Sequence, residues 1–303
     1  NDDRICTHFN DKNTYGRSYT LKHRFSKLTE DSYKYGYNLQ EQWDYAMEID
    51  PEFVFVTGWN EWNMGKFPGP PWVLDLNSTQ IAFVDQYDRE HSRDIEPDID
   101  GYLDTYYLLL AANIRRFKGL EPADRKPSVK TIDIMNFDDW KDVKPEYVAH
   151  KGTASKRDYP GIGDTYYKID TGRNDFVLAK VAKDDSNYYF YAECSNNITP
   201  DTDENWMCLL IDKDRSKETG WEGYDILVSA GRIKVYKDGE WINKGTCRYS
   251  VQGNKMCYVL SKDILGDGSF EFKWSDNITF DDVMNFYKHG DCAPFGRFNY
   301  VCG

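Results

Sequence analysis

Phe53-Val54-Phe55-Val56-Thr57-Gly58-Trp59-Asn60-Glu61-Trp62, at residues 53–62, decides how the first part of the chain is interpreted. Its four consecutive apolar strand formers, ended by Gly58, are typical of a strand buried on both faces of a parallel sheet. A helical pattern starts at Asn38 and ends before Pro51. Helix, buried strand and polar-aromatic cluster in this order predict an α/β fold, with Trp59–Trp62 at the carboxyl end of a strand.

The rest of the chain divides by its hydrophobic period. Residues 104–118 carry apolar side chains at helical spacing, with Gly119 as the stop. We predict that this helix closes a first domain, residues 1–118, and that residues 119–130, which contain two prolines, form a linker. In residues 131–303 the period changes to two and turn residues recur, which is typical of an antiparallel β-sandwich. The predicted fold class is therefore α/β plus all-β.

Composition excludes several classes of protein. The 303 residues have 40% hydrophobic and 29% charged side chains, as soluble globular proteins do. Aromatic residues make up 16%, which excludes a disordered chain and leaves ring faces for flat ligands such as sugars. The net charge of −13 argues against nucleic acid and anionic membranes as partners. No apolar run reaches the roughly 18 to 20 residues that a membrane span needs.

The seven cysteines are concentrated at the end of the chain, where six of them follow residue 193. Such clustering predicts a disulfide-stapled C-terminal region. Without a Cys-x-x-Cys pair and with only scattered histidines, we do not expect a zinc site. Six cysteines allow about fifteen connectivities, and we chose pairs on consecutive predicted strands, across a predicted turn or close in sequence: Cys194–Cys208, Cys247–Cys257 and Cys292–Cys302.

Three Asn-x-Ser/Thr sequons, at Asn77, Asn197 and Asn277, are typical of a secreted glycoprotein, although such triplets also arise by chance. We therefore predict an extracellular location and take the sequence as a mature or processed chain.

The cluster Trp59-Asn60-Glu61-Trp62 carries the clearest chemistry. A carboxylate held among two indole rings and an amide can act as an acid, a base or an electrostatic stabiliser on a sugar stacked on those rings. The alternative is that both tryptophans are core residues and Glu61 is a satisfied buried acid. On these residues, on Ile95-Glu96-Pro97-Asp98 and on the helix from Asp104, the sequence resembles the barrel enzymes of glycoside hydrolase family 99 and the related WbsX-type proteins over about residues 36–118.

This resemblance implies the C-terminal portion of a (β/α)8 barrel that hydrolyses glycans. It implies Glu61 as base or stabiliser, Asn60 as orienting residue, and Trp59 and Trp62 as stacking residues. The family uses a second glutamate three positions on, where this chain has Met64, so we take Glu96 as the first candidate for the second carboxylate.

The length of the first domain matters for this interpretation. A complete barrel takes about 250 residues, so we expect an N-terminal chain of the same precursor to complete this one, with Cys6 as a candidate bridge to it.

The charged segment from Asp85 to Asp94 is a candidate rim for sugar hydroxyls. Its acidic and basic side chains offer bidentate hydrogen bonds, and nearby aromatic rings offer flat faces. The alternative is a solvated loop with internal ion pairs. The predicted rim residues are Trp72, Asp85, Tyr87, Arg89 and Arg93.

The second domain resembles carbohydrate-binding modules of family 9 and their DOMON-type relatives over about residues 131–303. The resemblance rests on Phe137-Asp138-Asp139-Trp140, Gly172-Arg173-Asn174-Asp175 and the segment 206–214. It implies sugar binding, with Trp206 and Trp221 as candidate stacking residues whose alternative is a place in the core. It also implies a possible calcium site, for which Asp212, Asp214 and Asp225 are the candidate ligands and a charged turn is the alternative.

Together these patterns predict a secreted carbohydrate-active protein, a glycoside hydrolase-like barrel end joined to a sugar-binding module. The alternative is a non-catalytic lectin or a structural extracellular glycoprotein. A second carboxylate within about 5 to 10 Å of Glu61 would distinguish them, because glycosidase pairs use that separation.

Overall fold

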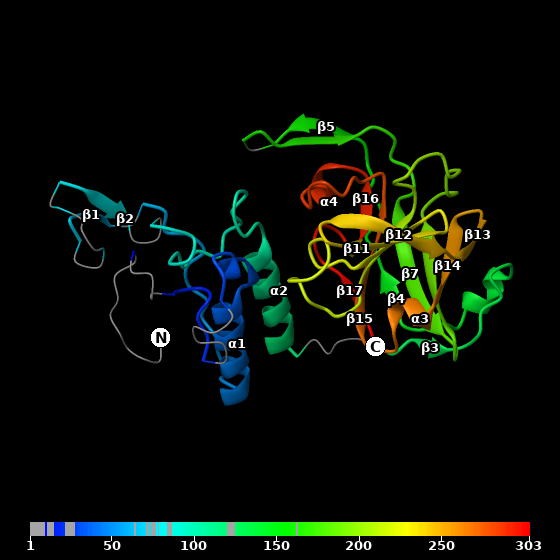
Figure 1. The fold of residues 1–303 in the computed structure, drawn as a ribbon, viewed down its shortest axis with the longest axis horizontal. Helices are drawn as coiled ribbons and strands as arrows, with labels where there is room; N and C mark the ends of the chain where they lie inside the picture. Colours follow the sequence, from blue (N-terminus) through cyan, green and yellow to red (C-terminus); the bar gives the residue numbers. More distant parts are fainter. Residues whose placement is uncertain are drawn as a thin grey trace. The chain divides into compact units, whose positions relative to one another are not determined.

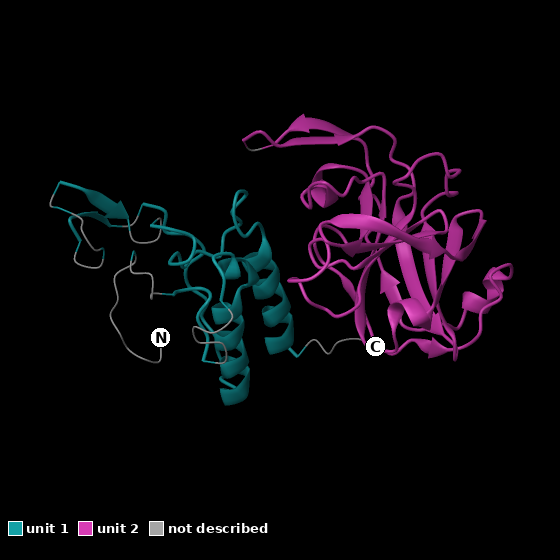
Figure 2. Ribbon diagram, viewed as in Figure 1, with its two compact units in different colours: residues 1–121 teal, residues 122–303 magenta. Residues whose placement is uncertain are grey.

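The computed structural model describes residues 10, 15–21, 28–63, 65–70, 73, 77, 79–83, 87–119, 125–161 and 163–303. The chain divides into two compact units, residues 1–121 and 122–303 (Figure 2). Among the described residues, no helix combines the length and the apolar character that crossing a membrane requires. Four residues of the sequence analysis lie outside the described ranges: Cys6, Met64, Trp72 and Asp85.

Unit 1 is built on two helices, α1 (Tyr37–Ile49) and α2 (Thr105–Phe117), at the positions that the sequence predicts (Figure 1). A short helix, η1 (Ser32–Tyr35), precedes α1, and β1 (Lys66–Pro68) pairs antiparallel with β2 (Ile81–Phe83). Gly36, between η1 and α1, has a φ of 69°, which favours glycine.

The two helices contact through side chains. Asn113 of α2 donates to Gln40 of α1 at 3.0 Å, and Arg116 pairs with Asp44 at 2.9 Å. Beside them, a small core of Ile95, Tyr102 and Tyr106 is buried.

The segment Phe53–Val56 is not a strand, so the prediction of a (β/α)8 barrel portion is wrong. Phe53 and Phe55 are 73% and 74% exposed, and their rings stack 6.3 Å apart on one side of an extended segment. Among the described residues, residues 51–57 make no backbone hydrogen bond and the strands of unit 1 form only the antiparallel pair β1–β2. Strand formers need neighbouring strands to pair with, and the described part of unit 1 offers none to this segment.

Unit 2 contains two larger sheets and a hairpin (Figure 1). The β9 sheet has the order β12 (Glu240–Thr246), β11 (Arg232–Lys237), β10 (Ile226–Ser229), β9 (Cys208–Asp212), β15 (Phe270–Asp276) and β16 (Asp291–Ala293), and β17 (Tyr300–Cys302) also pairs with β15. The β8 sheet has the order β13 (Arg248–Gln252), β14 (Lys255–Ser261), β8 (Asn187–Cys194), β7 (Phe176–Lys183) and β3 (Ser128–Val129), and β4 (Glu146–Val148) pairs with β7. The hairpin pairs β5 (Arg157–Pro160) with β6 (Tyr166–Ile169). The short helices are η2 (Phe137–Trp140), α3 (Lys262–Leu265) and α4 (Asn285–Lys288).

Strand β8 is apolar on both faces. Phe190 points into the core between the sheets, where its ring lies 5.7 Å from that of Phe272 on β15. Tyr191, next in sequence, belongs to the cluster on the other face, and its ring lies 4.9 Å from that of Trp140 in η2. Two facing sheets whose strands pair almost entirely antiparallel confirm the predicted β-sandwich.

The three predicted disulfides are wrong, because all six of these cysteines are free thiols: Cys194, Cys208, Cys247, Cys257, Cys292 and Cys302. Strand register gives the reason.

On β15, Cys292 lies opposite Ser275 and Cys302 opposite Phe270. These positions are about 17 Å apart along the strand, whereas a disulfide needs Cα atoms within about 7 Å.

The other two pairs fail in the same way. Cys257 lies opposite Ser250 rather than Cys247, and Cys194 and Cys208 lie in different sheets.

Candidate functional site

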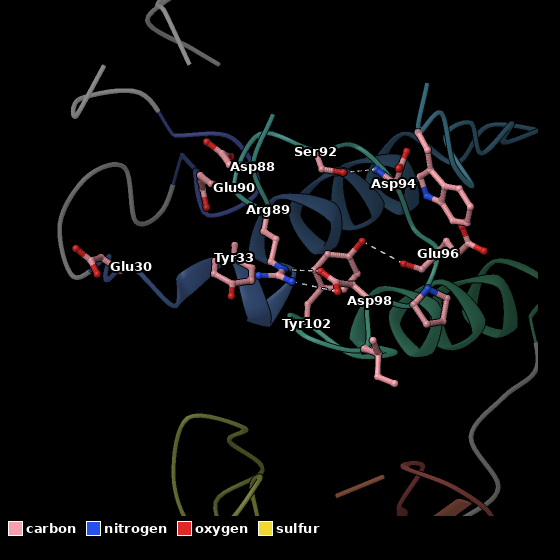
Figure 3. A pocket seen from close by; sticks show the side chains of 13 residues that line it. Glu30, Tyr33, Asp88, Arg89, Glu90, Ser92, Asp94, Glu96, Asp98 and Tyr102 are labelled. Carbon is pink, nitrogen blue, oxygen red and sulfur yellow. Dashed lines mark hydrogen bonds and ion pairs between the residues drawn. The ribbon is translucent and has the colours of Figure 1, made fainter. Parts of the chain in front are cut away.

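Unit 1 holds a pocket of about 720 Å³ (Figure 3). Most of its wall comes from the loop between β2 and α2, and the rest from the segment around η1 and from Trp62. The lining residues are Glu30, Tyr33, Trp62, Asp88, Arg89, Glu90, Ser92, Asp94, Glu96, Pro97, Asp98, Ile99 and Tyr102.

Residues 16–18 hold the pocket loop in place. The buried guanidinium of Arg17 lies 4.5 Å from the ring centre of Tyr102 and 3.0 Å from Ser92 Oγ, to which it donates. It also donates to the backbone oxygens of Ser92 and Asp94. On the same loop, the carboxylate of Glu90 accepts from the backbone N–H of Gly16 at 2.7 Å. Arg17 is therefore a positioning residue behind the pocket wall.

Two lining carboxylates have partners on their own loop. Asp98 accepts from Arg89 Nε at 2.5 Å, and this bond raises the pKa of Arg89 despite its partial burial. Asp88 accepts from the backbone N–H of His91 at 2.8 Å and lies 2.8 Å from its Nδ1. Burial acts to raise the pKa of Asp88, but the hydrogen bonds from His91 outweigh it and leave the pKa below the ordinary value. Asp88 is therefore charged at neutral pH.

At the other end of the pocket, the segment around Trp62 is joined to the segment around Glu96. Asn60 Nδ2 donates to Glu96 Oε2 at 2.9 Å, and the backbone N–H of Glu96 donates to Trp59 O at 3.0 Å. The hydroxyl of Tyr102 donates to Glu96 O at 3.1 Å, as Figure 3 shows. Trp62 is 56% exposed. An open indole face and a positioned carboxylate thus line the same pocket, a combination suited to a polar ligand with a flat apolar face.

The structure brings together some of the predicted residues of unit 1 and leaves others out. Trp62, Arg89 and Glu96 line the pocket, and Asn60 holds Glu96. Glu61 does not line it. The carboxylate of Glu61 is half-exposed and lies 3.8 Å from the guanidinium of Arg93.

The other two predicted aromatic residues of unit 1 that the structure describes are also outside the lining. Trp59 packs edge-on against Tyr107 and Tyr87 against His91, with ring centres 6.2 and 6.4 Å apart.

Sequence reasoning missed several lining residues, Tyr33, Tyr102 and Glu30 among them. Tyr102 lies two residues before the second predicted helix, and its place there was the only available signal. Nothing in the sequence connects Glu30 or Tyr33 with a loop almost sixty positions later.

The predicted stacking residues of the sandwich are packed. Trp206 is 2% exposed and donates through Nε1 to Thr199 O at 2.8 Å, which makes it a core residue and corrects its assignment as a sugar-stacking residue. The ring of Trp221 lies 5.5 Å from that of Phe280 and 6.1 Å from that of Phe286, so aromatic neighbours already cover part of it.

The three aspartates proposed for calcium do lie together. One carboxylate oxygen from each of Asp212, Asp214 and Asp225 falls within 4.8 Å of the others. Burial raises the pKa of Asp212 to about 6, against the effect of Lys217, whose Nζ is 3.2 Å away. Oxygen donors of this kind suit calcium, but the ammonium of Lys217 already supplies positive charge here. Calcium binding stays a prediction.

The sequons differ in their surroundings. Asn77 is exposed, and its Oδ1 accepts from Thr79 Oγ1 at 2.6 Å. Asn197 is exposed as well, whereas Asn277 has a φ of 59° and donates its N–H to Asn205 O. Glycosylation stays a prediction, which the mass of the native chain before and after enzymatic deglycosylation would test.

No protein-family model matches the chain, and no curated protein matches it. Two solved structures are similar to it, both of a carbohydrate binding module family 9 from Caldicellulosiruptor kristjanssonii. The complex with cellotriose is 12% identical, covers 50% of this chain and 74% of its own, and has a TM-score of 0.27. The complex with glucose is 13% identical, covers 50% of this chain and 75% of its own, and has a TM-score of 0.28. TM-scores this low do not establish a shared fold.

Proposed function

We propose that this chain binds glycans and that the pocket of unit 1 is the binding site. The observation that carries the proposal is the exposed indole of Trp62 in the same wall as Glu96, whose carboxylate Asn60 holds in place. Sugar rings present an apolar face and a rim of hydroxyls, so one indole and a few fixed carboxylates suit both parts. A volume of about 720 Å³ lies within the usual range for small-ligand pockets.

The non-catalytic alternative is the one that we retain. Glu61 lies outside the pocket wall beside Arg93, and Met64 stands where the resembling family has its second glutamate. We therefore expect no turnover of α- or β-linked oligosaccharides. Turnover by the native chain that Glu61→Gln abolishes would contradict this and restore the predicted hydrolase. We keep an extracellular location as part of the proposal, on the sequons alone.

Trp62→Ala should weaken glycan binding roughly tenfold or more, because stacking and ring burial together contribute about 1.5 to 3 kcal/mol. Isothermal titration of the full chain with neutral and charged oligosaccharides measures this. Trp59→Ala is the matched control, since Trp59 is similarly exposed but does not line the pocket. Equal losses in both variants, or no loss in Trp62→Ala, would refute the assignment of the site.

A further inference from the structure

The pocket is far more acidic than the chain around it. Of the thirteen lining side chains that the structure describes, six are carboxylates and one, Arg89, is a cation. The whole chain has 51 acidic residues against 38 lysines and arginines, so composition alone does not account for this ratio. The carboxylates are Glu30, Asp88, Glu90, Asp94, Glu96 and Asp98.

The cations that the structure describes near the pocket already have partners. Arg89 binds Asp98 through Nε at 2.5 Å and through Nη2 at 3.4 Å. Arg17 adds a second guanidinium behind the ring of Tyr102, but it is buried and donates to Ser92 and to the backbone oxygen of Asp94. Lys34, whose Nζ lies 5.8 Å from the ring centre of Tyr33, pairs with Asp31 at 2.6 Å. Counting these three cations against the six carboxylates still leaves the described lining negative.

Some lining carboxylates remain able to accept from a ligand. Glu96 accepts from Asn60 through Oε2, and no hydrogen bond to its Oε1 is seen among the described residues. Glu30 is exposed at the opposite end of the pocket. Such groups would bind an ammonium by charge-assisted hydrogen bonds, and the exposed ring of Trp62 offers a cation–π contact.

We propose that the glycan bound in this pocket carries free amino groups, as glucosamine-type sugars do. This inference rests on the proposed function and names the class of ligand. Uronic acids and sulfated sugars would bring like charge into the pocket and be rejected, while neutral sugars would keep only the stacking and hydroxyl contacts.

The test uses four oligosaccharides of equal length: β-1,4-linked glucosamine, its N-acetylated counterpart, the cello-oligosaccharide and an oligogalacturonate. Titration of the full chain is carried out at a pH at which the amines are protonated, at low and at high salt. We expect the glucosamine oligomer to bind at least tenfold more tightly than the acetylated and neutral oligomers, and the galacturonate not to bind. The preference should shrink in high salt, because partly exposed charges are screened.

Two variants localise the effect. Glu96→Gln removes a charge and keeps an acceptor for Asn60, so it should reduce the preference for the glucosamine oligomer severalfold. Glu61→Gln is the matched control, because Glu61 lies outside the pocket, and it should leave the preference unchanged.

The outcomes separate the two proposals. Equal binding of the amino and neutral oligomers, weakened by Trp62→Ala, would overturn this inference and leave glycan binding standing. Binding of none of the four would overturn both. If the amino oligomer binds but neither Trp62→Ala nor Glu96→Gln weakens its binding, the binding is adsorption to an acidic chain. That result would overturn the inference.

Discussion

Arg173→Ala should destabilise the chain by about 3 to 5 kcal/mol, the usual cost of breaking a buried ion pair. Arg173 donates through Nε to Asp276 at 2.7 Å and through Nη1 to Asp203 at 2.6 Å. The side chain of Asp276 is fully buried at the end of β15. Removing the guanidinium therefore leaves a buried carboxylate with hydrogen-bond donors but no cation. Burial already raises the pKa of Asp276, so the variant should lose more stability as pH rises.

Urea unfolding of the native chain and the variant measures this difference. Arg215→Ala is the matched control, since Arg215 is half-exposed and lies 3.7 Å from Glu271. We expect the control to lose at most about 1 kcal/mol, because its guanidinium is half-exposed and Glu271 keeps Lys217 as a partner at 3.3 Å. If both variants lost the same amount, the network around Arg173 would not be a main support of the sandwich.

Asp291→Asn should stabilise the chain by about 3 kcal/mol at neutral pH, since each pKa unit is worth about 1.4 kcal/mol. Asp291 is 3% exposed, and burial raises its pKa from 3.8 to about 6. The folded chain thus holds the proton more tightly than the unfolded chain. Stability from this group is present below pH 3.8 and is lost as pH rises to about 6. Asparagine carries no charge, and its carbonyl can still accept from the N–H of Phe176, now 2.8 Å from Asp291.

The check is urea unfolding of both chains at several pH values between 4 and neutrality. The native chain should lose stability across this range, and Asp291→Asn should lose less. Asp212, whose pKa is also about 6, titrates in both chains and cancels in the comparison. Asp238→Asn, at an exposed position, serves as the control and should behave as the native chain does. An unchanged pH dependence in Asp291→Asn would contradict the prediction.

The sandwich could be predicted from sequence because its signal is local. Strand β8 is a nearly continuous run of aromatic and apolar residues bounded by turn residues, which is visible in the sequence, and Phe190 and Tyr191 are buried on its two faces. The sequence could not show in the same way whether a barrel is present. The strand propensity of Phe53–Val56 is real, but a strand forms only where neighbours pair with it, and no local pattern reveals whether they are present.

The sequence revealed only part of the candidate site, again because a local pattern does not show which distant residues it meets. Asn60 and Trp62 share a side with Glu96, whereas Glu61 between them turns to Arg93. Proximity in sequence identified the cluster but not which of its side chains meet. The cysteines show the same limit, because their clustering suggested pairs that the strand register separates.

The position of β15 has a consequence for how the protein is made. Lys273 on β15 pairs with Leu210 on β9, 63 residues earlier in the chain. At about 5 to 20 residues per second, a ribosome needs roughly 3 to 13 s to synthesise that interval. Throughout it, the nascent chain carries β9 with one edge unpaired and the apolar side chains of Leu209 and Ile211 without their final cover. A chain that ends before residue 270 would lack β15, β16 and β17 together, and β9 would then be an edge strand of its sheet.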